Sequence, residues 1–153
     1  MKKFVFKLDP LLKYREYLER IAQQATARAH MDVQACEAQI RQLELTQRAK
    51  EDEMTHHVEK GVPASRFRKF HQYLEALEAI KNEEEENKET LKKILKQKLV
   101  ELKKKSVDKK AMEVYREKML TRYQHEANQA EQKELDEVSI LKTARQAGNE
   151  ESL

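Results

Sequence analysis

A single interruption divides this chain into two long segments. The stretch Gly61–Phe67 holds one of only two glycines and one of only two prolines. Glycine can take the left-handed conformation that ends a helix, Pro63 disfavours helix at the residue before it, and Ser65 is a good cap for a following helix. Because a short link between helices usually makes them antiparallel neighbours, we expect residues 60–65 to form the tip of a helical hairpin.

The composition favours long helices over a compact globule. Charged residues make up 39% of the 153 residues, aromatic residues make up 6%, and tryptophan is absent, so there is little apolar surface for a thick core. Ala, Glu, Lys, Leu, Arg and Gln dominate, as in coiled coils. High charge is also typical of disordered chains, and the periodicity of the apolar residues must therefore decide between the two.

Apolar residues recur at steps of three and four on both sides of the tip, which indicates a coiled coil and not strands. We expect a first helix over about 10–59, capped by Asp9, and a second over about 66–147. The stripe of the first helix, which Gln47 and Lys50 interrupt, consists of Leu11, Leu18, Ala22, Ala25, Ala29, Val33, Cys36, Ile40, Leu43 and Met54. The stripe of the second, which Glu83–Glu86 interrupts, consists of Phe67, Phe70, Leu74, Leu77, Ile80 or Lys81, Leu91, Leu95, Leu99, Leu102, Met112 and Met119, and continues more weakly through Ala127 or Ala130, Val138 and Leu141.

These patterns predict an all-α fold, a long antiparallel two-helix coiled-coil hairpin with an overhanging C-terminal helix. Residues 1–153 are expected to form a single elongated coiled-coil domain. The helices are unequal, with about 50 and about 80 residues at 1.5 Å per residue, so the first runs out opposite roughly Met112. Beyond about Tyr115 we expect the second helix to lack an intramolecular partner, which leaves it marginal in water unless something packs on it.

The sequence argues against catalysis and cofactor binding. It contains no Gly-rich phosphate loop, no Cys-x-x-Cys and no His-Glu-x-x-His. Glu53 and His56 have the spacing of two metal ligands on one helical face, but a di-iron bundle needs two such motifs, so no metal site is expected. Cys36 lies in the apolar stripe, where it is a small buried group rather than a nucleophile. We therefore expect a protein that is not an enzyme and takes no cofactor.

Charge and hydropathy limit the partners and the location. The 31 basic and 28 acidic residues are interspersed, and the lysines of 92–110 lack the aromatic neighbours needed for base stacking, so nucleic acid is not expected. Met1–Lys7 has no apolar run of the kind found in signal peptides, and no run of about 18 apolar residues could span a bilayer. The single cysteine fits a reducing compartment, so we expect a cytoplasmic protein without direct membrane insertion.

Large apolar residues gather just after the tip, at Phe67, Phe70, Tyr73, Leu74 and Leu77. A two-helix hairpin buries only one stripe of each helix, so some of them must be exposed, and exposed aromatic groups on a polar surface mark contact sites. We expect Tyr73 and Leu77, a turn apart, to lie beside the interface and to anchor a partner. Ordinary packing of the tip is the alternative.

Three stretches of the chain together resemble a known family. They are Phe4-x-Phe6-x-Leu8-x-x-Leu11-Leu12-x-x-Arg15, the tip Gly61–Phe67 followed by Tyr73-Leu74, and Glu131-Gln132-Lys133-x-Leu135-Asp136-Glu137. This pattern resembles the flagellar export protein family FliJ, and the resemblance covers nearly the whole chain.

The resemblance implies a soluble, non-enzymatic component of the bacterial flagellar type III protein export apparatus, with a coiled coil similar to the γ-subunit stalk of rotary ATPases. It implies association with the hexameric export ATPase FliI, contact with the export gate FlhA, and binding of substrate-specific export chaperones. It would place the protein in the cytoplasm, peripherally associated with the inner membrane at the flagellar base. The alternative is a generic coiled-coil scaffold or homodimerising adaptor that pairs through its overhang.

Aligned on the tip, the family's gate-contact patch falls on Gln39, Leu43, Tyr73, Leu77 and Ile80. The tip aromatics Phe67 and Phe70 are a weaker candidate for partner binding. The C-terminal helix offers a third set of candidates, which comprises Gln132, Lys133, Asp136 and Glu137.

Overall fold

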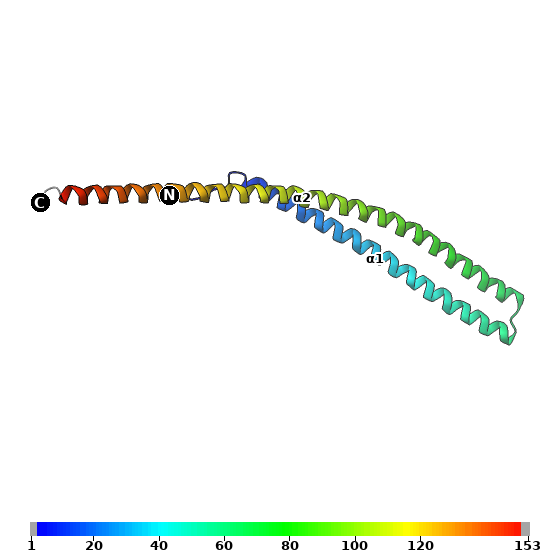
Figure 1. Ribbon diagram of the computed structural model, residues 1–153. Helices are drawn as coiled ribbons and strands as arrows, with labels where there is room; N and C mark the ends of the chain where they lie inside the picture. The colour runs from blue at the N-terminus through cyan, green and yellow to red at the C-terminus, as the bar shows by residue number, and fades with distance from the viewer. Residues whose placement is uncertain (1–2, 151–153) are drawn as a thin grey trace. The chain divides into compact units, whose positions relative to one another are not determined.

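The computed structural model describes residues 3–150, which form two helices, α1 (Asp9–Lys60) and α2 (Ala64–Glu150), with no strand in that range. The helices lie side by side from the tip and run in opposite directions (Figure 1). The all-α hairpin that the sequence predicts is confirmed. Each helix begins and ends within three residues of its expected bounds.

Glycine ends α1 as expected. Gly61 has a φ of 86° and donates its N–H to the carbonyl of Val58 at 3.1 Å. This left-handed conformation is open to glycine without steric cost, whereas a side chain would strain it.

The start of α2 differs from the prediction. The carbonyl of Pro63 accepts the N–H groups of Arg66 and Phe67 at 3.0 and 3.2 Å, so the helix begins at Ala64. Ser65, the expected cap, therefore lies inside the first turn. Because the carbonyl of the residue before a helix accepts the first helical hydrogen bond, the backbone of Pro63 serves where a serine side chain was expected.

Two compact units make up the chain, and each is described by itself. One comprises Leu18–Ser106 and includes the tip, and the other comprises the residues up to Tyr17 together with those from Val107 onward. That the whole chain behaves as one elongated domain stays a prediction.

In the unit Leu18–Ser106, the helices meet along a thin apolar interface. The buried apolar side chains all belong to the predicted stripes and are Ala29, Val33, Cys36, Ile40, Phe70 and Leu77. Glu19 and Thr26 are buried as well. Leu99, also predicted there, is 50% exposed. Two successive four-residue steps from Leu91 rotate position 99 by about 80° off the interface, and Lys98 takes its place, with its carbonyl accepting a hydrogen bond from Thr26 Oγ1 at 3.3 Å.

Polar residues fill the interruptions in the apolar stripe. Gln47 Nε2 donates to Glu78 Oε2 on α2 at 3.1 Å, and Lys81 Nζ lies 3.9 Å from Glu44 Oε1 on α1. At Gln47 and Lys81, the partner helix therefore offers a polar group that contacts the polar side chain.

Cys36 is buried, as expected. Its Sγ lies 3.4 Å from both the carbonyl oxygen and Oε2 of Glu84. Burial, followed by the hydrogen bond with Glu84, raises the pKa of the Cys36 thiol above its ordinary value of 9.0. Both effects penalise the thiolate.

We expect Cys36 in the folded protein to react with a disulfide reagent far more slowly than in urea, because the thiolate is the reactive form. A pKa higher in the folded than in the unfolded chain contributes stability that is complete below pH 9 and is lost as pH rises through the folded pKa. As pH is raised above 9, the melting temperature of Cys36→Ser should therefore fall less than that of the parent protein. Fast labelling of the folded protein would contradict this account.

In the other unit, the segment before α1 packs on α2. Phe6, Leu12 and Met112 form a buried cluster, with Phe4 and Met119 against it. The Phe4 ring lies with its centroid 5.4 Å from that of Tyr123. We expected α2 to lack an intramolecular partner beyond Tyr115, but its pairing continues for about two more turns, to Tyr123. Residues 3–8 are not helical, and they pack along α2 ahead of α1, with the Phe6 ring 6.0 Å from that of Tyr115 between centroids, so the paired part of α2 extends beyond the length of α1.

One residue of the predicted stripe is displaced in this unit. Leu11 is 38% exposed, whereas its neighbour Leu12 is 6% exposed and belongs to the buried cluster. Spacing alone did not distinguish these adjacent leucines.

Within residues 3–150, no other segment packs on the last part of α2. Every residue from 128 to 149 is exposed, and Figure 1 shows this orange-to-red stretch of helix alone. In hydrogen exchange of the free protein we expect fast exchange over 128–149 and protection over 107–123, because packing is what stabilises helices of this kind. Equal protection of both stretches would show that the C-terminal stretch has a partner.

Candidate partner-binding site

Phe70 and Leu77 form the buried side of α2 next to the tip. Each is 7% exposed, and the Phe70 ring lies 5.7 Å from the ring of His57 on α1, centroid to centroid. The expectation that Leu77 is exposed beside the interface is therefore wrong, and Phe70 is equally buried. Positions 70, 74, 77 and 81 follow steps of four, three and four, so Leu77 continues the interface.

Tyr73 and Ile80 form the exposed side. Each is 44% exposed, and residues seven apart lie on the same helical face. Phe67 is also exposed, at 46%. The crowded aromatic residues thus divide as expected, because Phe70 turns inward while Phe67 and Tyr73 remain accessible.

A lysine of α1 contacts both an exposed and a buried aromatic ring of α2. Lys50 Nζ lies 5.0 Å from the ring centroid of Phe70 and 5.2 Å from that of Tyr73. Both distances are within the range of cation–π attraction, worth about 0.5–1 kcal/mol at an exposed site. Lys50 therefore fixes which side of α1 faces Tyr73.

The remaining predicted residues of α1 continue from Lys50. Leu43 is half-buried and Gln39 is exposed, and steps of seven and four place them on the face of Lys50. The helices are antiparallel, so a step of seven residues away from the tip leads from Lys50 to Leu43 on α1 and from Tyr73 to Ile80 on α2. We call the surface of Gln39, Leu43, Tyr73 and Ile80 the tip face.

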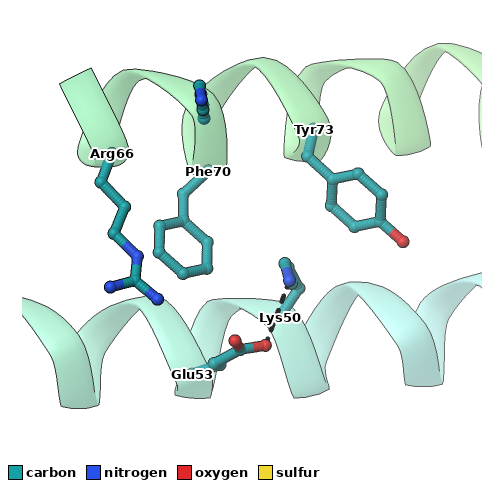
Figure 2. A pocket seen from close by; sticks show the side chains of 6 residues that line it. Lys50, Glu53, Arg66, Phe70 and Tyr73 are labelled. Atoms are coloured by element: carbon teal, nitrogen blue, oxygen red, sulfur yellow. Dashed lines mark hydrogen bonds and ion pairs between the residues drawn. The ribbon is translucent and has the colours of Figure 1, made fainter.

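A hollow of about 290 Å³ opens beside the tip face. Figure 2 shows Phe70 and Tyr73 projecting from α2 toward α1, with Lys50 and Glu53 facing them and Arg66 at one end. We call it the tip hollow, and its lining comprises Lys50, Glu53, Arg66, Lys69, Phe70 and Tyr73.

The charges of the tip hollow do not balance. Lys50 Nζ donates to Glu53 Oε2 at 3.2 Å, which offsets one positive charge with the single carboxylate of the lining. Across residues 3–150, neither Arg66 nor Lys69 forms an ion pair. The first turn of α2 also contains no acidic residue, although the positive end of the helix dipole lies there.

Glu53 and His56, which have the spacing of two metal ligands, do not pair with each other. Glu53 pairs with Lys50 and lies 3.9 Å from His57, not from His56. Among the described residues, no group of three or more His, Cys, Asp and Glu side chains is arranged to hold a metal ion. Within the same residues, neither helix has a stretch long and apolar enough to cross a membrane. The site offers apolar contact and positive charge, which suit binding.

The C-terminal candidates lie in the other unit. Gln132, Lys133, Asp136 and Glu137 are all exposed on α2. Leu135 and Val138 lie among them and are 64% and 49% exposed, so this stretch presents apolar groups as well as charges.

Sequence reasoning missed the cationic part of the site. Lys50 was interpreted only as an interruption of the stripe, and Arg66 and Lys69 were not singled out. The signal was available, because Arg66, Phe70 and Tyr73 recur at steps of four and three. What the spacing could not supply was the register of α1 against α2, which brings Lys50 to the two rings.

Comparison with known proteins identifies one family. The family model described as Flagellar FliJ protein matches residues 3–148. No curated protein and no solved structure matches the chain.

Proposed function

Because the chain belongs to the FliJ family of flagellar proteins, whose members are non-catalytic components of the flagellar export apparatus, we propose that it acts there as a stalk and escort protein. In this role it binds the export ATPase FliI, the export gate FlhA and substrate-specific chaperones, without catalysing a reaction. The family match over residues 3–148 and the helical hairpin support the proposal. Its place of action would be the cytoplasmic face of the inner membrane at the flagellar base.

The tip face is the proposed contact with the export gate. The observation that carries this assignment is the joint exposure of Tyr73 and Ile80 on a hairpin whose surface is otherwise rich in charge. An aromatic group and an aliphatic group a short distance apart make a compact anchor, and such anchors dominate binding energy. Leu77 supports the tip face from within the interface and does not itself contact the gate.

The test is a titration of the full-length protein with the purified cytoplasmic domain of the gate, followed by calorimetry. We expect a saturable complex. The absence of binding under conditions in which the hairpin is fully helical would refute the gate assignment.

The exposed end of α2 is the proposed contact with the ATPase ring. The stretch 128–149 is exposed throughout, and a helix without a packed face is marginal in water. A ring that encloses it would supply the missing contacts. The candidates Gln132, Lys133, Asp136 and Glu137 lie in this stretch.

Replacing Leu135 and Val138 together with alanine should weaken binding to the ATPase about tenfold, because two apolar contacts on one face are lost. Ile140→Ala is the matched control, since Ile140 is 68% exposed but lies on the opposite side of the helix. Both variants should keep the parent melting temperature. Equal binding by all three proteins would exclude this contact.

The same exposed apolar residues favour a second candidate, a coiled-coil scaffold that dimerises through α2. Sedimentation of the full-length protein alone separates the two functions. The stalk function requires a predominantly monomeric protein that associates with the ATPase, whereas the scaffold function requires a stable homodimer without it.

A further inference from the structure

We propose that the tip hollow binds a side-chain carboxylate of an acidic peptide segment, one containing Asp or Glu next to an apolar residue. The inference rests on the proposed function only in taking the partner at the tip to be a protein. It assigns the tip hollow a charged ligand, in addition to the apolar contact of the tip face, with which the hollow shares Tyr73.

Two uncompensated cations supply the attraction. The lining contains three cationic side chains and one carboxylate, and that carboxylate is hydrogen-bonded to Lys50 at 3.2 Å. Arg66 and Lys69 are left without a counter-ion within residues 3–150. An arginine fork matches a carboxylate with two parallel hydrogen bonds, and the start of α2 adds the positive end of a helix dipole.

The aromatic wall supplies the apolar part of the recognition. Phe70 forms its buried base, and Tyr73 is 44% exposed at its rim. Figure 2 shows both rings on the side of the hollow that α2 contributes. A carboxylate held at Arg66 and Lys69 would leave the neighbouring apolar side chain of the same peptide against the Tyr73 ring.

The surroundings favour a short acidic segment over a nucleic acid. The lining of the hollow itself contains one carboxylate, that of Glu53. Glu75 and Glu78 follow on α2, so the positive patch ends close to the hollow. A nucleic acid requires positive charge along a continuous track, which this surface does not provide.

The experiment is an NMR titration of isotope-labelled full-length protein. The probe is the end-blocked peptide Glu-Phe-Asp-Glu, compared with Gln-Phe-Asn-Gln, at low ionic strength. We expect the acidic peptide to shift the signals of residues 64–73 saturably and the neutral peptide to leave them in place.

A pair of matched double variants separates the hollow from general positive charge. Arg66→Gln with Lys69→Gln should weaken binding about tenfold or more, because charge-assisted hydrogen bonds are lost. Lys60→Gln with Arg68→Gln removes the same charge from exposed positions at the tip that lie outside the hollow and should change affinity less than about twofold. Glu53→Gln should tighten binding about two- to fivefold by removing the repelling carboxylate, a gain that misfolding could not produce.

Four results would overturn the proposal: no saturable shift, equal binding of the neutral peptide, equal weakening by the two double variants, or displacement of the peptide by lower concentrations of inorganic phosphate or of a short oligothymidylate. The gate titration is run in parallel. Peptide binding without gate binding would refute the gate assignment and leave the hollow intact, whereas gate binding without peptide binding would refute the hollow alone.

Discussion

Replacing Tyr73 and Ile80 together with alanine should weaken binding to the cytoplasmic domain of the export gate about thirtyfold, or about 2 kcal/mol. Both side chains are 44% exposed on one face of α2, so a partner can cover them and expel water from them. Calorimetry or fluorescence anisotropy measures the loss. The melting temperature and helicity should stay near those of the parent, because neither residue is part of the buried interface.

The control for this variant is Leu99→Ala with Val100→Ala. These residues are 50% and 63% exposed, lie on the same helix and in the same unit, and are distant in sequence from the tip face. We expect their replacement to leave gate binding unchanged. Equal weakening by both double variants would mean that the gate recognises apolar groups along α2 without a defined site.

Replacing Leu77 with alanine should lower the free energy of unfolding by about 2–3 kcal/mol. Leu77 is 7% exposed and packs in a thin interface that has few other large side chains near the tip. Removal of its side chain leaves a cavity that two helices alone close poorly. Urea denaturation followed by circular dichroism measures the change.

Ile80→Ala is the comparison within the same helix, and it should cost less than about 1 kcal/mol because Ile80 is accessible. The pair therefore distinguishes support of the site from contact with the partner. If Leu77→Ala melts like the parent protein and still loses gate binding, Leu77 contacts the partner directly and the division between buried and exposed sides is wrong.

The sequence alone determined the class of fold and, to within three residues, the ends of its helices. Gly61 and Pro63 are the only strong breakers between Pro10 and Gly148, and a chain with steps of three and four on each side of them has few alternatives to a hairpin. Gly61 at a φ of 86° is the local conformation that this reasoning required. The family followed from the same stretches, since the matched region spans residues 3–148.

Spacing could not decide between adjacent candidates for the interface. The members of the pairs Leu11 and Leu12, Lys98 and Leu99, and Tyr73 and Leu77 lie about 40° to 100° apart around their helix. The drift of about 20° per heptad adds up to angles of that size along helices of this length. Which member of each pair is buried depends on the side chains that the other helix presents.

Contacts between segments far apart in the sequence were decided by the tertiary structure alone. The non-helical residues 3–8 bring Phe4 to Tyr123, 5.4 Å between ring centroids, a contact that the helical periodicity of neither segment predicts. Across the tip, the register of the two helices brings Lys50 within 5.2 Å of the Tyr73 ring. It also creates a hollow whose Arg66 and Lys69 form no ion pair with any of residues 3–150. Each helix carries its own pattern in the sequence, but the offset between them is set by how both surfaces pack, and the candidate site is a product of that offset.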